Sequence, residues 1–182
     1  LVDLVFGALA QALPLRIPAA SQGTMNNVAM GWIDSAAGTR WDYYETLAGG
    51  IGGGPNGAGR DAVHSHMTNT LNTPVESLEM HFPLRVHRYA IRRGSGGKGQ
   101  QAGGAGIARE YEFLDRAQLS LLTERRRIAP WGLNGAGSGA LGRNSLNGRT
   151  LPGKCSIEVK KGDRLLIETP GGGAWNAEDT GV

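Results

Sequence analysis

Two histidines and a carboxylate lie close together in the segment 61–66, where they could bind a metal ion or transfer a proton. The spacing of His64 and His66 would place both imidazoles on one side of an extended chain. Imidazole together with the Asp61 carboxylate suits zinc or manganese, and imidazole also titrates near neutral pH, so that either histidine could carry a proton. The polar lining of a site and plain structural hydrogen bonding remain open for the same residues.

A strip of amide and hydroxyl side chains follows the histidines, at Asn69, Thr70, Asn72 and Thr73. Amide groups both donate and accept hydrogen bonds, which suits the recognition of a neutral polar group such as a lactam. A turn network that fixes the loop to the next helix would use the same residue types. Glu76 is either a general base, if it is desolvated, or an acid that favours the positive end of a helix.

Glycine accounts for 30 of the 182 residues and forms a long loop from Gly49 to Gly59. The phosphate-binding pattern G-x-G-x-x-G occurs three times, but never with the strand–helix context and the following acid of a dinucleotide site. Lys98 precedes a glycine rather than the Ser or Thr of a P-loop. The glycines are therefore expected to be turn residues with positive φ. Backbone N–H groups around Gly52 and Gly53 could still bind an anion, because glycine allows close approach.

The composition argues against several classes of protein. A formal net charge of +3 is too small to indicate nucleic acid or an anionic membrane as a partner, and no apolar run approaches the roughly 20 residues that span a bilayer. The charge run Glu124–Arg127 favours a solvated edge or an interface. Cys155 is the single cysteine, so an internal disulfide is excluded and a reducing, cytoplasmic compartment is expected.

The first element that must position these side chains is a helix. It is predicted over residues 1–13, because apolar side chains recur there at spacings of three and four: Val2, Val5, Leu9 and Leu13. Such a helix needs an apolar partner to be stable. A chain that begins within a helix and without methionine is expected to be a C-terminal piece of something longer, or a processed product.

Strands are predicted over much of the remaining chain. In order they are an apolar strand ending near residue 34, a strand over Trp41–Leu47, an irregular strand over Pro83–Arg93, a hairpin of Ala108–Leu114 with Gln118–Thr123, and a hairpin of Ser156–Val159 with Arg164–Glu168. A Thr73 cap followed by Pro74 predicts a short helix. The fold class is therefore predicted as α+β, mainly antiparallel β with an N-terminal helix and long glycine-rich loops. A single domain over 1–182 is expected, with the helix and site loops in 1–80 and the β-rich portion in 81–182.

Several of these segments together resemble the hydantoinase B/5-oxoprolinase family. The segments that carry the resemblance are Gly23–Asn27 (GTMNN), Tyr43–Glu79, Arg88–Glu110, Glu124–Gly139 (ERRRIAPWGLNGAGSG) and Lys160–Trp175. Their number and order make the match strong over nearly the whole chain. The resemblance is to the C-terminal part of the family's full-length B subunit.

This resemblance implies a two-component, or fused, ATP-dependent hydrolase of cyclic amides. One component, similar to hydantoinase A, binds ATP and Mg and phosphorylates the cyclic amide, and the B component completes ring opening. The expected partners are that ATP-binding component, the N-terminal remainder of the B subunit and a small-molecule substrate. Where family members carry a metal, its ligands lie in that N-terminal part, so no metal is assigned to His64 and His66 and no cofactor is expected on this chain alone.

For the ring-opening step, amide donors would hold the substrate and the developing oxyanion, and an imidazole would carry the proton. The predicted catalytic residues are His64, His66 and Asn69, and the predicted substrate-binding residues are Asn72, Thr70, Asp61, Gly52 and Gly53. Other functions remain open: a B-like subunit of an acetone- or acetophenone-type carboxylase, a structural module without a catalytic group, or a glycine-rich β binding domain. The isolated chain is expected to be inactive.

Overall fold

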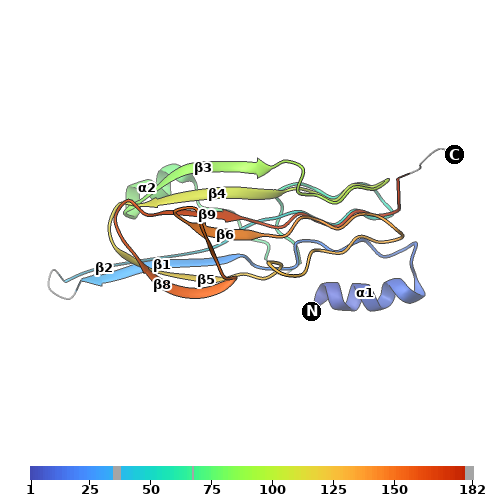
Figure 1. Cartoon of the computed structure of the whole chain (residues 1–182), viewed down its shortest axis with the longest axis horizontal. Helices are drawn as coiled ribbons and strands as arrows, with labels where there is room; N and C mark the ends of the chain where they lie inside the picture. The colour runs from blue at the N-terminus through green and yellow to red at the C-terminus, as the bar shows by residue number, and fades with distance from the viewer. Residues whose placement is uncertain (35–37, 67, 179–182) are drawn as a thin grey trace.

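Two antiparallel β-sheets pack face to face in the part of the chain that the computed structural model describes, which is residues 1–34, 38–66 and 68–178 (Figure 1). The first sheet runs through β2 (Thr39–Thr46), β1 (Asn27–Asp34), β5 (Ala117–Leu122) and β8 (Lys154–Val159). The second runs through β3 (Leu84–Arg92), β4 (Gly106–Phe113), β9 (Arg164–Glu168), β6 (Arg143–Leu146) and β7 (Arg149–Leu151). The helices are α1 (Val2–Ala12) and α2 (Val75–His81). The expected fold class, α+β with mainly antiparallel β and an N-terminal helix, is confirmed.

The core lies between the two sheets. Along β1, Val28 and Met30 point inward and are buried, and along β4 Tyr111 and Phe113 do the same from the opposite sheet. Successive side chains of a strand point to opposite faces, so each strand contributes every second residue to the core. The irregularity expected in β3 is also confirmed, as a register shift between Val86 and Arg88.

Both hairpins predicted from the sequence are wrong. β4 pairs with β3 and β9, whereas β5 pairs with β1 and β8. The turn after β4 therefore crosses from one sheet to the other, and so does the turn between β8 and β9. The two crossing turns bond to each other, because the Gly162 N–H donates to the Phe113 carbonyl and the Phe113 N–H donates to Asp163. Alternation and turn residues mark where strands end, but burial between two sheets decides which strands pair.

The prediction for the second helix is confirmed in place and corrected in detail. α2 begins after Pro74, which is its N-cap, and no side chain caps it. The backbone N–H of Thr73 instead donates to Glu45 Oε1 at 2.7 Å. Thr73 therefore ties the loop before α2 to the first sheet rather than capping the helix.

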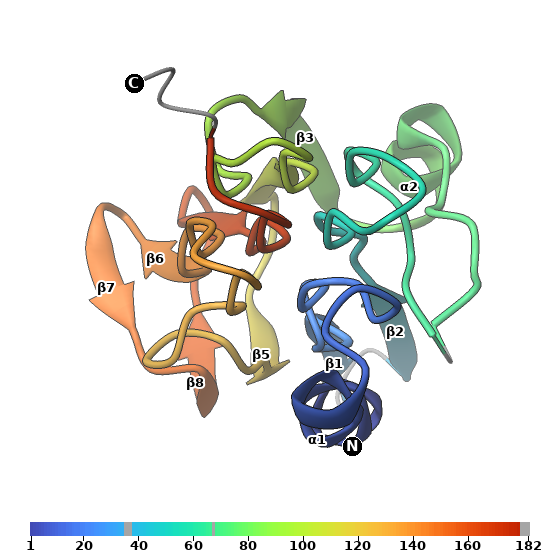
Figure 2. The ribbon, with the colours of Figure 1, turned by 90° about the vertical axis from the view of Figure 1, so that its right-hand side faces the viewer.

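Glycine-rich segments extend side by side beyond the sandwich, and within the described residues they are 18–22, 49–54, 95–104, 129–140 and 170–175 (Figures 1 and 2). We call them the glycine bundle. The segment Gly171–Trp175 shows the pattern best. Its N–H groups at residues 171 and 174 donate to segment 129–140, and those at residues 172 and 175 donate to segment 95–104. The N–H group of residue 173 donates to Ala20. The direction of hydrogen bonding thus repeats every third residue, as expected of extended chains with three residues per turn.

The bundle explains why so many glycines are needed. A Cβ on Gly172 would lie 2.1 Å from the Ile51 carbonyl oxygen, and one on Gly50 would lie 2.0 Å from that of Gly104. Neither Gly172 nor Gly50 has a positive φ. The expectation that the glycines serve as turn residues holds for positions such as Gly94, at φ 76°, but not for these central positions. There, glycine is required because backbones touch where a side chain would begin.

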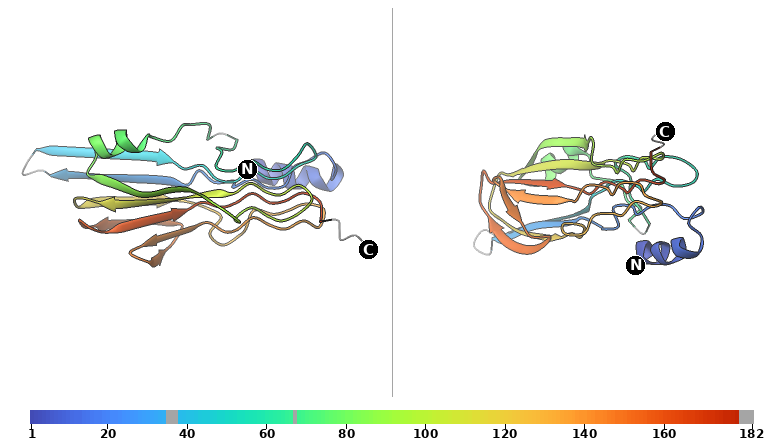
Figure 3. Two further views of the ribbon diagram at one scale, coloured as in Figure 1. Left: turned by 90° about the horizontal axis from the view of Figure 1, so that it is seen from above. Right: turned by 45° about the vertical axis from the view of Figure 1, so that its right-hand side comes forward.

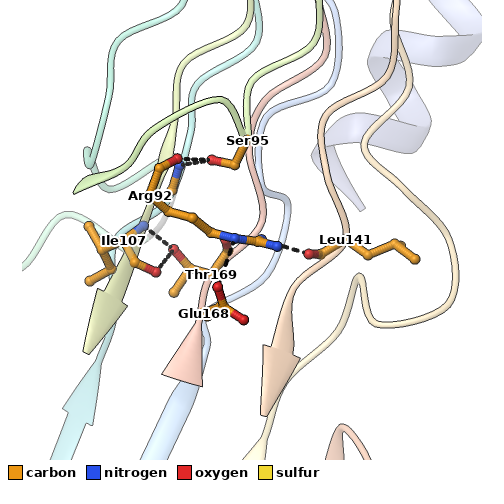
Figure 4. Close-up of polar contacts among 7 residues, drawn as sticks. Arg92, Ser95, Ile107, Leu141, Glu168 and Thr169 are labelled. Carbon is orange, nitrogen blue, oxygen red and sulfur yellow. Dashed lines mark hydrogen bonds and ion pairs between the residues drawn. The ribbon is translucent and has the colours of Figure 1, made fainter. Parts of the chain in front are cut away.

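Arg92, at the end of β3, joins the second sheet to the glycine bundle (Figure 4). Its guanidinium donates to the carbonyl oxygens of Leu141 at 2.7 Å and Thr169 at 3.1 Å. It also pairs with Glu168 at 3.3 Å, while the Ser95 hydroxyl donates to the Arg92 carbonyl at 2.7 Å. The Arg92 side chain thereby ties the end of β3 to residues 141 and 169, each next to a segment of the bundle, while Ser95 of the bundle bonds the Arg92 backbone.

Helix α1 lies beside the glycine bundle (Figure 3). The side that it buries is not the one expected from the sequence. Asp3 and Ala10 are its buried residues, whereas Val5 and Leu9 are exposed. The helix predicted over residues 1–13 is confirmed, but its apolar stripe faces away from the rest of the described chain. The inward side instead brings a carboxylate to the loops beneath the helix.

Candidate functional site

A cleft opens where four segments of the chain meet: the start of α1, residues 23–25, the loop that carries Ser65, His66 and Thr68, and the turn 123–128. In the described part of the chain it comprises adjoining cavities of about 250 and 900 Å³, with Asp3 in the wall of both. We call it the α1 cleft. Most of its polar side chains come from loops, including the Glu124 carboxylate, and the helix supplies the Asp3 carboxylate.

A line of charged and titratable side chains runs from one cavity to the other: His66 lines the smaller cavity, Arg125 lines the larger one, and Asp3 lines both. His66 Nε2 lies 3.4 Å from Asp3 Oδ1, and Arg125 Nη2 lies 2.8 Å from Asp3 Oδ2. The Asp3 side chain is 10% exposed and that of His66 is 24% exposed. The Asp3 carboxylate thus lies beside one imidazole nitrogen of His66, but Asp3 Oδ1 accepts no hydrogen bond from any described residue. An imidazole in a cleft can exchange a proton with a bound molecule.

The local backbone makes this arrangement possible. Gly23 has φ 59°, and a Cβ there would lie 2.1 Å from Asp3 Oδ2, so only glycine leaves room for the Asp3–Arg125 pair. His66 itself has φ 55°, a conformation that costs a non-glycine residue about 1–3 kcal/mol and is found preferentially at functional sites. The Phe6 ring meets the His66 ring edge-on at 5.9 Å between centroids. Packing against Phe6 thus helps to hold a strained residue whose imidazole lies at the cleft.

His64 lies in different surroundings from His66. Neither of its ring nitrogens has a hydrogen-bond partner, and both are buried. Burial lowers the pKa of His64 below its ordinary value, and the carboxylate of Glu45 opposes that effect. The two imidazoles, expected from their spacing to lie on one side of the chain, therefore have different surroundings and do not face one site together.

The lowered pKa of His64 has a consequence for stability. The unfolded chain binds a proton at His64 near pH 6.5, whereas the folded chain does so only at lower pH, so acidification favours unfolding. Stability from this source is present above pH 6.5 and is lost as the pH falls below it. We expect chemical denaturation at pH 7.5 and 5.5 to show a smaller loss of stability in His64→Gln than in the parent chain. An unchanged loss would contradict this prediction.

The amide and hydroxyl strip is only partly directed to open space. Both polar atoms of the Asn72 side chain have partners within the chain: Oδ1 accepts a hydrogen bond from the Tyr89 hydroxyl at 2.9 Å, and Nδ2 donates to the Thr46 carbonyl at 3.0 Å. The Thr70 hydroxyl donates to the Thr68 carbonyl at 3.4 Å. Asn69 is exposed and forms no hydrogen bond with any described residue. Of the two asparagines expected to hold a substrate, Asn69 alone has a free amide.

Asp61 and the glycine loop have internal partners. Asp61 Oδ1 accepts the Ala105 N–H at 2.7 Å. Every backbone N–H from residue 49 to 54 donates to a protein acceptor, including that of Gly52 to Ser21 Oγ and that of Gly53 to Gly173. These N–H groups are therefore not free to bind an anion, and this loop offers no cradle for a nucleotide phosphate. Asp61, Gly52 and Gly53 remain predictions as substrate-binding residues.

A buried ion pair lies beneath the loop. Glu45 Oε2 contacts Arg109 Nη1 at 2.8 Å and accepts from the Tyr111 hydroxyl at 3.1 Å. The Arg109 guanidinium lies over the rings of Tyr89 and Tyr111, at 4.6 and 5.2 Å from their centroids. Arg109 and Tyr111 have no exposed surface. This cluster supports the loop that carries the histidines.

Sequence reasoning missed Asp3 and treated Arg125 only as part of a charge run. The signal for Asp3 was available, since it is the one acid in the apolar helix α1. No local pattern could have paired it with His66, because the contact exists only after folding.

Glu76, by contrast, is an exposed acid in the first turn of α2 and lines none of the cavities described here. Among the described residues, no three His, Cys, Asp or Glu side chains gather as they would around a metal ion. No helix in that part of the chain is long and apolar enough to cross a membrane.

The sandwich with its glycine bundle is the fold of one part of two ATP-dependent enzymes of known structure. The ATP-dependent caprolactamase of Pseudomonas jessenii matches with a TM-score of 0.73 at 23% identity, over 94% of this chain and 32% of the enzyme chain. A nucleotide-free acetone carboxylase matches with a TM-score of 0.59 at 17% identity, over 87% of this chain and 26% of the other. Likeness at these identities shows the fold alone.

Sequence comparison is more specific. The family model described as hydantoinase B/oxoprolinase matches residues 1–178, and the chain belongs to that family. A 5-oxoprolinase of Dictyostelium discoideum is 43% identical over 165 residues, which is 88% of this chain and 13% of the relative. The chain spans less than a third of the length of the curated relatives it matches. The resemblance noted in the sequence is thereby confirmed.

Proposed function

We propose that this chain is the C-terminal part of a B-type component that opens the ring of a cyclic amide, which a separate ATP-binding component with Mg first activates by phosphorylation. Membership of the hydantoinase B/oxoprolinase family and the 43% identity to a 5-oxoprolinase support the reaction class. The single observation that carries the proposal at residue level is the His66–Asp3–Arg125 line in the α1 cleft.

In this proposal His66 is the proton carrier. A water molecule forms a bond to the activated ring carbon, and its proton passes to the His66 nitrogen that faces away from Asp3. The ring C–N bond breaks as that proton reaches the departing nitrogen, which leaves a ring-opened acyl phosphate. A second water molecule then hydrolyses the acyl phosphate to the carboxylate and inorganic phosphate. Asp3 lies beside the imidazole, and Arg125 fixes Asp3 by an ion pair. Asn69, on the same loop and with a free amide, donates to the developing oxyanion. His64, with both nitrogens buried, is the weaker candidate for proton transfer.

The test is substrate turnover by the complete enzyme with its ATP-binding component, with 5-oxoproline as the first substrate. We expect His66→Gln to lower turnover about 100-fold, which is the ordinary contribution of a proton-transfer group, and Asp3→Asn to cause a smaller loss. His81→Gln, an exposed histidine on α2, is the matched control and should turn over normally. Native mass spectrometry checks that each variant still assembles. Normal turnover by assembled His66→Gln would show that His66 is not the proton carrier.

A further inference from the structure

Apart from Asp3 and Arg125, the side chains that line the larger cavity of the α1 cleft have no part in the proposed proton transfer. It has a volume of about 900 Å³, within the range of sites for small organic molecules. The turn Glu124–Ile128, the segment Pro152–Lys154 and the first turn of α1 form its walls. Four cationic side chains and two carboxylates line it.

Both of those carboxylates already have cationic partners. Asp3 pairs with Arg125 at 2.8 Å, and Glu124 pairs with Lys154 at 2.6 Å. Arg126 and Arg127 have no ion pair with any described residue. The cavity wall therefore carries an excess of positive charge that the described chain does not neutralise.

Arg126 is held in place by neutral groups. Its Nη1 donates to Asn26 Oδ1 at 2.6 Å and to the Glu124 carbonyl at 2.8 Å, and its Nη2 donates to Asn144 Oδ1 at 2.6 Å. Its Nε is buried and has no partner. Amide and carbonyl oxygens orient a guanidinium without cancelling its charge. Burial, reinforced by the positive charge of Arg92, lowers the Arg126 pKa to about 10, which still leaves the group protonated at neutral pH.

Arg127 is the accessible member of the pair. Its side chain is exposed and forms no hydrogen bond or ion pair with any described residue. Beside it, the cavity is lined by apolar side chains that are also exposed, Leu4 and Ile128, each at 73%. A ligand that suits these walls has an anionic head and an apolar body.

We propose that the α1 cleft binds a small organic anion, with its phosphoryl or carboxylate group at Arg127 and in the field of Arg126 and its apolar body against Leu4 and Ile128. Guanidinium groups bind both oxyanions with strong, charge-assisted hydrogen bonds. If the proposed function holds, the anion is the phosphoryl group of the activated amide, because the cavity shares Asp3 with the His66 pocket. That identity rests on the proposed function, whereas anion binding itself does not.

The test is calorimetric titration of the complete protein with inorganic phosphate and, separately, with acetate, at low salt and without turnover. We expect saturable binding that Arg127→Gln weakens at least tenfold. Arg149→Gln removes another exposed arginine, at the start of β7 and outside the cavity, and should bind as the parent does. Tighter binding of phosphate than of acetate assigns the site to a phosphoryl group, and the reverse order assigns it to a carboxylate.

The proposal is overturned if neither anion binds, or if Arg127→Gln and Arg149→Gln bind alike. Because Arg127 is exposed, its substitution is not expected to disturb folding, and circular dichroism of both variants checks this. The measurement involves no proton transfer. A failure here is therefore distinct from normal turnover by His66→Gln, which would count against the proposed function instead.

Discussion

Gly172→Ala is expected to cost the chain more than about 3 kcal/mol of folding free energy, a large part of the 5–15 kcal/mol that stabilises an ordinary domain. The new Cβ would lie 2.1 Å from the Ile51 carbonyl oxygen and 2.3 Å from its carbon. Overpacking of a core by a flexible side chain typically costs 1–3 kcal/mol. Here the two atoms that the new Cβ would overlap both belong to the Ile51 backbone, so no change of side-chain rotamer can relieve the overlap. Moving the segment would also stretch the hydrogen bond from the Gly172 N–H to the Gly104 carbonyl, now 2.9 Å.

Gly7→Ala is the matched control for this substitution. Gly7 lies within α1, and a Cβ there would meet the Trp131 ring at 3.5 Å, an ordinary contact. Alanine is favoured over glycine inside a helix by about 1 kcal/mol. Chemical denaturation followed by tryptophan fluorescence should therefore show Gly7→Ala to be as stable as the parent or more so. Equal midpoints for Gly172→Ala and the parent would refute the packing account of the glycine bundle.

Arg109→Met is expected to destabilise the chain by about 3–5 kcal/mol, the ordinary cost of removing one partner of a buried ion pair. The substitution leaves the Glu45 carboxylate, 5% exposed, without its cation. The Tyr111 hydroxyl and the Thr73 N–H remain as donors to Glu45, but neither carries a charge. Loss of the guanidinium also removes its contacts with the Tyr89 and Tyr111 rings.

A double-mutant cycle separates the ion pair from general packing. Glu45→Gln with Arg109→Met removes both charges, so we expect the double variant to be less destabilised than the sum of the single ones. Urea denaturation of the four proteins measures this. Strict additivity would mean that the pair contributes no coupling energy. Because Thr73 donates to Glu45, the single variants should also loosen the loop that carries His66.

Much of the fold could be predicted from local sequence. The helix at the start of the chain, the strand over Trp41–Leu47 and the irregular β3 follow from apolar spacing and turn residues, and the structure confirms them. The pairing of β4 with β5, and of β8 with β9, could not be predicted in the same way. A short turn between two strands is compatible with a hairpin and with a crossing between sheets, and the choice depends on which faces are buried together.

The residues of the candidate site likewise divide into those that local sequence could predict and those that it could not. His66 and Asn69 were recognisable because their side chains can transfer protons or donate to an oxyanion whatever the fold. Asp3 was not recognisable as part of a site, since 122 residues separate it from Arg125. The free amide of Asn69 and the fully used amide of Asn72 also look alike in the sequence. Only the contacts made on folding distinguish them.

The sequence by itself determined the family, the places where glycine would be abundant, and the order of the helices and of the strands other than β6 and β7, which it did not predict. These properties depend on residue types and on spacings of a few positions. The tertiary structure alone decided that the central glycines serve backbone contact rather than turns, and that a helix carboxylate, a loop histidine and an arginine meet in one cleft. Such contacts join segments far apart in the chain, and their geometry is set by how the sheets, the bundle and α1 pack together.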